Sequence, residues 1–221
     1  MEKNHIYFMP GLAASSLIFE RIHLPEAHFE MHLLDWELPL INESLLAYAE
    51  RMSKLVVHPN PVLIGVSFGG VLVQEMAQFL KPKKVIIISS VKTNLEVPLR
   101  MKFAKSTKAY KLLPTSWLQN VELLAKYSFG DAIKRRFKLY EKYLSMREKV
   151  YLDWAIEQML LWDRTEPDPN VIHIHGTLDE VFPAKNIQNY IPVNGGTHIM
   201  ILSKYRWLNE NLPKIILENM Q

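Results

Sequence analysis

The sequence predicts an α/β protein with a mostly parallel sheet, helices on its faces and a helical insertion after the fourth strand. Two observations carry this prediction. Short, almost continuously apolar runs alternate with segments of helical periodicity, and such runs are typical of parallel strands buried on both faces. The alternation stops between Ser90 and Pro167, where only helical patterns follow one another. At 221 residues the chain is long enough for one domain with a substantial core.

Five apolar runs are the expected strands, and helical patterns connect them. Asn42-Glu43-Ser44 opens one helix, since a serine is a favoured N-cap. A second covers residues 68–80 and stops at Lys81-Pro82, because proline cannot continue a helix. The closing helix covers residues 204–219, with Pro213 expected to kink or restart it. The expected strands are residues 5–9, 31–34, 62–64, 85–88 and 171–174.

The insertion divides the chain into a core, residues 1–90 and 166–221, and a helical region, residues 91–165. The insertion carries 15 Lys and Arg against 8 Asp and Glu, whereas the rest of the chain is net acidic. Solvated faces of amphipathic helices explain this excess, with anionic substrates, nucleic acid or a membrane surface as alternatives. Prolines in residues 166–170 predict a return linker. The helices expected within it are residues 101–112, 117–126, 132–143 and 148–162.

Composition excludes several classes of protein. The chain has no cysteine, which rules out disulfides, thiolate metal sites and a cysteine nucleophile. The first apolar run is too short for a signal peptide, and no segment approaches the ~20 apolar residues of a membrane span. The net charge is +3 and no nucleic-acid motif is present. We therefore expect a cytoplasmic protein that needs no cofactor and binds no nucleic acid, and the oligomeric state is left open.

The segment Gly65-Val66-Ser67-Phe68-Gly69-Gly70 lies between a strand pattern and a helix pattern. Strand, tight turn, serine and helix are the layout of a nucleophile elbow, in which the serine side chain stands clear of the sheet. The helix start beside it carries roughly +0.5 charge, which stabilises a developing oxyanion. The alternative is a glycine-rich turn in which Ser67 caps the helix.

A reactive serine needs a base and a carboxylate that orients the base. Asp179 follows the fifth strand in His175-Gly176-Thr177-Leu178-Asp179, and His198 follows in Asn194-Gly195-Gly196-Thr197-His198. In isolation Asp179 is explained as a turn or helix cap, and His198 as a polar residue near a helix start. The order Ser, Asp, His on loops after strands favours a catalytic triad of Ser67, Asp179 and His198.

The oxyanion needs a second donor besides the helix start. Met9-Pro10-Gly11-Leu12 follows the first strand at the same sheet edge, so we expect the backbone N–H groups of Leu12 and Phe68 to form an oxyanion hole. Ser15 or Ser16 is expected to cap the following helix.

Eight histidines raise the question of metal binding. His173 and His175 share one face of a strand, but no acidic cluster accompanies them, so we expect no metal there. The others except His198 are interpreted as scattered surface or strand-end residues: His5, His23, His28, His32 and His58.

With these residues assembled, the chain resembles the α/β-hydrolase superfamily over nearly all of its length. Residues 65–69 match the elbow, 176–179 the acid loop and 198 the terminal histidine. The resemblance implies that the insertion is a cap, that the first two strands of the full fold are missing and that the sheet has about six strands. It further implies that His175 is structural. Pro10 departs from the histidine often found before the oxyanion glycine. Asp35-Trp36-Glu37-Leu38-Pro39 and Asp153-Trp154-Ala155-Ile156 resemble a small bacterial group of α/β hydrolases of unspecified substrate.

The expected function is a serine hydrolase that cleaves a small or medium carboxylic ester or thioester, with a small-molecule acyl substrate as its partner. The alternatives are an acyltransferase or carbon–carbon hydrolase with the same triad, or a ligand-binding protein without turnover. Cap shape and water access decide among them, and the sequence reveals neither.

Overall fold

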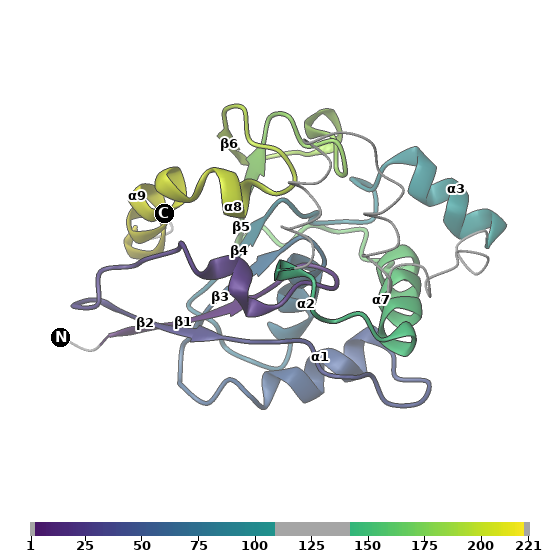
Figure 1. Cartoon of the computed structure of the whole chain (residues 1–221), viewed down its shortest axis with the longest axis horizontal. Helices are drawn as coiled ribbons and strands as arrows, with labels where there is room; N and C mark the ends of the chain where they lie inside the picture. The colour runs from purple at the N-terminus through teal and green to yellow at the C-terminus, as the bar shows by residue number, and fades with distance from the viewer. Residues whose placement is uncertain (1–2, 109–141, 219–221) are drawn as a thin grey trace.

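The computed structural model describes residues 3–108 and 142–218 (Figure 1). Six parallel strands form one sheet in the order β2-β1-β3-β4-β5-β6, which confirms the predicted fold class. Every expected strand is present, and a sixth strand of three residues follows Asp179. The strands are β1 Asn4–Met9, β2 Phe29–Leu33, β3 Val62–Val66, β4 Lys84–Ile88, β5 Val171–Gly176 and β6 Ile191–Val193.

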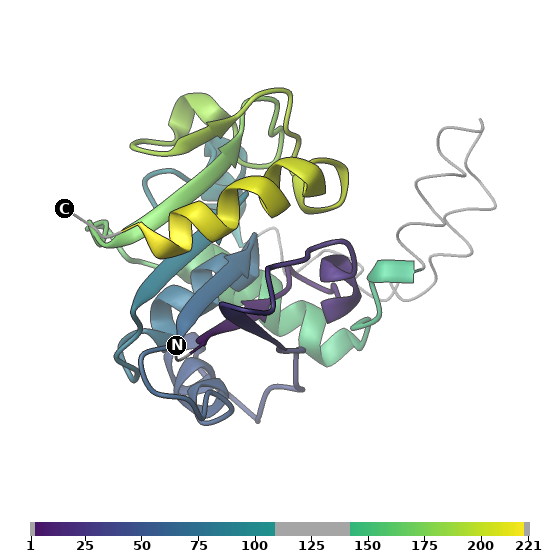
Figure 2. The same ribbon diagram turned by 90° about the vertical axis from the view of Figure 1, so that its left-hand side faces the viewer.

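Helices cover both faces of the sheet (Figure 2). One face packs against α1 Leu45–Ser53, α2 Phe68–Met76 and α7 Lys149–Leu161, with Tyr48, Leu72 and Tyr151 in its core. The other face packs against the 3-10 helix η1 Ser16–Phe19, α8 Met200–Ser203 and α9 Tyr205–Leu217. The central strands β3 and β4 are buried throughout, as their continuous apolar runs predict. A further 3-10 helix, η3 Ala184–Asn186, precedes β6.

Two helix predictions need correction. The helix expected over residues 68–80 stops at Met76, because Gln78 and Phe79 N–H bond to carbonyls three residues back and tighten the chain into turns. The closing helix does not restart at Pro213, and α9 continues through it. The break lies at Lys204, between α8 and α9. Ser44 caps α1 as expected, and its Oγ accepts from the Ala47 N–H at 3.2 Å.

Two parts of the expected helical region are described. α3 Leu99–Thr107 overlaps the start of the helix expected over 101–112, of which residues 109–112 lie outside the described residues, and α7 covers nearly all of the helix expected over 148–162. The helix expected over 117–126 and nearly all of that over 132–143 lie outside the described residues. Among the described residues, no helix is both long enough and apolar enough to cross a membrane.

Candidate active site

Ser67 lies in the turn between β3 and α2 with a backbone that few residues adopt. Its φ is 53° and its ψ is −121°, a strained conformation for a residue with a Cβ. The Ser67 N–H bonds to the Ile88 carbonyl at 2.9 Å, and Ser90 Oγ donates to the Ser67 carbonyl at 2.7 Å. Although Ser67 is the N-cap residue of α2, its side chain makes no capping hydrogen bond. Its hydroxyl therefore projects away from the helix start.

Ser67, His198 and Asp179 form one hydrogen-bonded chain. Ser67 Oγ lies 3.0 Å from His198 Nε2, and His198 Nδ1 lies 2.9 Å from Asp179 Oδ2. The Asp179 side chain is completely buried, whereas 22% of the His198 side chain is exposed. The structure thus brings together all three residues that the sequence nominates, although Ser67 and His198 are 131 positions apart in the sequence. The imidazole is positioned to accept the serine proton on one nitrogen while the carboxylate holds the other.

The carboxylate of Asp179 is fixed in rotation by the backbone of its own loop. Its Oδ1 accepts the N–H groups of Val181 at 2.8 Å and Phe182 at 2.9 Å and lies 3.2 Å from His198 Nδ1, while Oδ2 lies nearer to that nitrogen at 2.9 Å. The Phe182 ring also packs edge-on against the His198 ring, with centroids 5.5 Å apart. The turn-capping role considered for Asp179 is therefore present in addition to its contact with the histidine.

His175 anchors the acid loop from the strand below. Its Nε2–H donates to the Phe182 carbonyl at 2.9 Å, and its Nδ1 then accepts from His173 Nε2 at 3.1 Å. Burial lowers the pKa of both imidazoles, and the neighbouring His175 adds to this effect at His173. Both rings are therefore neutral near pH 7, and this pair is a hydrogen-bonded support of the loop.

The loop after β1 runs directly against the nucleophile. A Cβ on Gly11 would lie 3.3 Å from Ser67 Cβ and 4.0 Å from its Oγ, so glycine lets the backbone pass at this distance. Gly69 allows the reciprocal approach, because a Cβ there would lie 2.2 Å from the Pro10 carbonyl oxygen. Within the described residues, the Leu12 N–H has no recorded partner, and the Phe68 N–H opens α2 without an intrahelical acceptor. Both nominated donors thus lie on segments that flank Ser67.

Trp36, whose role sequence reasoning missed, supports both of these segments. Its Nε1–H donates to the Gly11 carbonyl at 2.8 Å, and its ring stacks on Phe68 with centroids 5.2 Å apart and planes at 10°. Trp36 is buried just beyond the end of β2, next to Asp35, which accepts from the Ser16 N–H and hydroxyl. Its position in the Asp35–Pro39 motif was the available signal, but a motif does not reveal which carbonyl the indole reaches.

Residues 143–151 join the same loop from the other side. The Ser15 N–H donates to the Tyr143 carbonyl at 2.8 Å, and the Met146 N–H donates to the Ala13 carbonyl at 3.1 Å. The Ala13 N–H reaches the Tyr151 hydroxyl at 3.4 Å. Ser15 is the N-cap residue of η1, but its side chain does not cap the helix and donates instead to Tyr143. Ser15 thus occupies the expected N-cap position, but its side chain makes no capping hydrogen bond.

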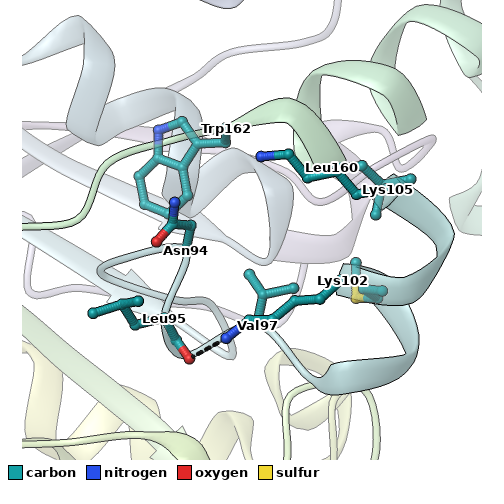
Figure 3. Close-up of a pocket in the computed structure, with 8 residues that line it drawn as sticks. Asn94, Leu95, Val97, Lys102, Lys105, Leu160 and Trp162 are labelled. Atoms are coloured by element: carbon teal, nitrogen blue, oxygen red, sulfur yellow. Dashed lines mark hydrogen bonds between the residues drawn. The ribbon is translucent and has the colours of Figure 1, made fainter. Parts of the chain in front are cut away.

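Two surface cavities flank this region without including the three central residues. One of about 250 Å³ lies between the loop after β4, α3 and α7, with Asn94, Val97 and Trp162 in its wall (Figure 3). Lys102 at its rim donates to the Leu95 carbonyl at 2.9 Å, the dashed line in Figure 3. A second cavity of about 180 Å³ lies beside Ser15 and Trp36. Among the described residues, neither is lined by Ser67, Asp179 or His198.

The remaining histidines are not all scattered, which corrects the sequence interpretation. His5, His32 and His58 come from three different segments, yet each offers a ring nitrogen within 4.8 Å of those of the other two. Their pairing depends on strand register and on one loop, neither of which a linear pattern encodes. His23 and His28 are exposed, as expected.

Comparison with known proteins places this architecture among solved structures. No protein-family model matches the sequence, and no curated protein matches it significantly. A hydrolase from Pseudomonas aeruginosa superposes with a TM-score of 0.70 at 12% identity, covering 98% of this chain and 91% of that one. An esterase from Exiguobacterium antarcticum gives 0.68 at 15% identity, with 98% and 93% covered. A bromoperoxidase from Bacillus anthracis gives 0.68 at 16% identity, with 99% and 93% covered. At these identities the likeness establishes the fold alone.

Proposed function

We propose that this protein, which has the α/β-hydrolase fold, is a serine hydrolase that cleaves a small or medium carboxylic ester or thioester. The observation that carries the proposal is the hydrogen-bonded chain from Ser67 Oγ through His198 to the buried Asp179. Hydrogen bonds that served only to stabilise the fold would not require a serine with a φ of 53° at a helix start, whose hydroxyl points at an imidazole. The esterase among the structural neighbours supports an ester as the substrate class.

In the proposed reaction Ser67 Oγ attacks the acyl carbonyl carbon while His198 Nε2 takes the hydroxyl proton. Asp179 Oδ2 holds the Nδ1–H of His198 and stabilises the imidazolium that forms. The negative oxygen of the tetrahedral intermediate accepts from the Leu12 and Phe68 N–H groups. Each such donor contributes about 2.7 to 4 kcal/mol in measured cases.

Collapse of this intermediate breaks the bond to the alcohol or thiol, which leaves with the proton from His198. A water molecule then attacks the acyl-enzyme carbonyl as His198 Nε2 removes one of its protons. The second tetrahedral intermediate collapses, Ser67 regains its proton and the carboxylic acid is released. No metal or redox cofactor enters this sequence of steps.

We further propose that residues 91–165 act as a cap over the core formed by residues 1–90 and 166–221. The hydrogen bonds between the loop after β1 and Tyr143, Met146 and Tyr151 support a cap whose base adjoins the oxyanion donors. Exchange of this region for that of another member of the fold is expected to change acyl-chain preference while covalent labelling of Ser67 persists.

The test combines covalent labelling with turnover. A fluorophosphonate probe is expected to label the wild-type protein at Ser67, and short p-nitrophenyl and thioester acyl substrates are expected to be hydrolysed. Ser67→Ala abolishes both, whereas Ser106→Ala, which alters an exposed serine on α3, changes neither. Equal labelling and turnover in wild type and Ser67→Ala would refute the mechanism. Product formation with an added alcohol acceptor would instead identify an acyltransferase.

A further inference from the structure

Three imidazoles meet beside the first strands of the sheet, far from Ser67. His5 lies in β1, His32 in β2 and His58 in the loop between α1 and β3. All three are partly buried, and their nearest ring nitrogens lie within 4.8 Å of one another. Figure 1 shows β1 and β2 side by side near the N-terminus of the chain. The cluster therefore joins three segments that are separate in the sequence.

Strand register explains why the side chains converge. In the parallel ladder His5 pairs with Glu30 and Tyr7 with His32. Because alternate residues of a strand share a face, all four side chains lie on the same face of the sheet. The Tyr7 ring packs on His32 with centroids 4.6 Å apart, and its hydroxyl reaches His58 Nδ1 at 2.6 Å. Tyr7 thus brings the loop histidine over the two strand histidines.

The spacing of these donors is close to that of a tetrahedral metal site. Zinc binds imidazole nitrogen at about 2.0 to 2.1 Å, which places neighbouring ligand atoms about 3.3 Å apart in a tetrahedron. His5 Nδ1 and His32 Nε2 are 3.1 Å apart. The Glu30 carboxylate faces the same two nitrogens at 3.7 and 3.8 Å and is half exposed. The rings of His5 and His58 are parallel with centroids 3.6 Å apart, so one must rotate for both lone pairs to point at one ion.

The surroundings supply a hydrogen-bond partner for the second ring nitrogen of one of these histidines. If His58 binds through Nε2, its Nδ1–H has the Tyr7 hydroxyl as acceptor, an oxygen that also accepts the Val57 N–H at 3.2 Å. Metal-bound histidines commonly donate their second ring N–H to such a partner.

We propose that His5, His32 and His58, with Glu30 as fourth ligand, form a structural site for one divalent transition-metal ion of the zinc type. Three imidazoles and one carboxylate suit Zn²⁺, whereas Mg²⁺ and Ca²⁺ prefer sets of oxygen ligands. The ion would connect β1, β2 and the loop before β3. His5 lies near the start of β1, whereas Met9 at its end pairs with Gly65, two residues before Ser67. Four residues of extended strand, about 13 Å, separate His5 from Met9, so the site is independent of the proposed chemistry at Ser67.

Metal binding is tested on full-length protein without a histidine tag, after EDTA treatment and dialysis. Titration with ZnCl₂, followed by calorimetry, is expected to give one equivalent bound. At a free Zn²⁺ concentration near 100 times Kd, the Tm is expected to rise by about 5 to 10 °C. Co²⁺ in place of Zn²⁺ is expected to give the intense visible absorption of a tetrahedral complex.

Variants separate this site from adventitious binding. His32→Ala and His58→Asn are each expected to weaken Zn²⁺ binding at least about tenfold and so to reduce the Tm shift by about half or more. His23→Ala is the matched control, since it alters an exposed histidine outside the cluster and should leave the affinity unchanged. Tyr7→Phe keeps all three imidazoles but removes the hydroxyl partner of His58, and it should weaken binding about tenfold or more.

The proposal is overturned by three results. These are the absence of Zn²⁺ binding by the wild-type protein, the same affinity in His32→Ala and His58→Asn as in wild type, or an equal loss in His23→Ala. A metal-free melting curve of each variant identifies one that fails to fold, and in that case Tyr7→Phe and His58→Asn decide the question.

Discussion

Asp179→Asn separates the orienting role of this carboxylate from its structural role. Oδ1 is held by the Val181 and Phe182 N–H groups, and an amide oxygen can take over both bonds. The amide NH₂ must then occupy the Oδ2 position and donate to His198 Nδ1. This forces the proton of His198 onto Nε2, which lies 3.0 Å from Ser67 Oγ and can no longer accept the serine proton.

The expected loss is large because the wrong tautomer removes the base altogether. The corresponding change in a measured serine protease lowers kcat by about 10⁴-fold, equivalent to about 5.5 kcal/mol of barrier. We expect kcat for p-nitrophenyl acetate to fall by about 10³- to 10⁴-fold, with a change in Tm of only a few degrees. The matched control is Asp168→Asn, because the partly buried Asp168 also accepts a backbone N–H through Oδ1. A kcat reduced less than about tenfold in Asp179→Asn, in protein with native circular dichroism, would refute the assigned role.

Three further predictions concern the supports of the site. Trp36→Phe keeps the ring on Phe68 but removes the indole donor, so the buried Gly11 carbonyl keeps only the Ala14 N–H at 3.0 Å; the lost hydrogen bond costs about 0.5 to 1.5 kcal/mol, and kcat/KM for the same ester should fall by up to about tenfold. An unchanged kcat/KM would contradict this. Gly69→Ala places a Cβ against the Pro10 carbonyl oxygen and should destabilise the fold by about 1 to 3 kcal/mol or more, seen as a lower Tm; a wild-type Tm would count against it. Burial lowers the pKa of His173, so below about pH 6.5 the unfolded state takes up a proton that the folded state does not. The free energy of unfolding therefore decreases as the pH is lowered, by up to about 1.4 kcal/mol per pH unit. Urea unfolding at several pH values should show that the free energy of unfolding depends less steeply on pH in His173→Gln than in wild type. An equal dependence in the two proteins would exclude His173 as its source.

The parts of the fold that were predictable are those encoded in consecutive residues. The apolar run of β4 predicts a strand buried on both faces, and in the structure this strand begins one residue earlier, at Lys84. Ser44 predicts the start of α1, because its side chain caps the helix. β6 was harder, because it has three residues and contains Pro192. Proline is tolerated there since β6 is the edge strand of the sheet.

The candidate site was predictable to the extent that it is built from strand ends. Parallel strands place their carboxyl ends at one edge, so Ser67, Asp179 and His198 could be nominated from order and spacing alone. The contact of Trp36 with Gly11 could not, since it joins residues 25 apart through one side-chain rotamer. The cluster of His5, His32 and His58 was missed for the same reason. Strand register aligns His5 and His32, and the Tyr7 hydroxyl positions His58. Neither contact can be inferred from the order of residues in the sequence.

The loop that carries the proposed oxyanion donor has one internal backbone hydrogen bond, from the Ala14 N–H to the Gly11 carbonyl at 3.0 Å. It takes its position from Trp36 on one side and from residues 143–151 on the other. Burial raises the pKa of Tyr151, so its hydroxyl stays neutral while it accepts the Ala13 N–H. Because Ala13 also accepts from Met146, a displacement of residues 143–151 breaks two hydrogen bonds on the residue next to Leu12. The position of the proposed cap and the direction of the Leu12 N–H are therefore physically coupled. For this reason a substrate that fits the cap poorly should lose kcat as well as affinity.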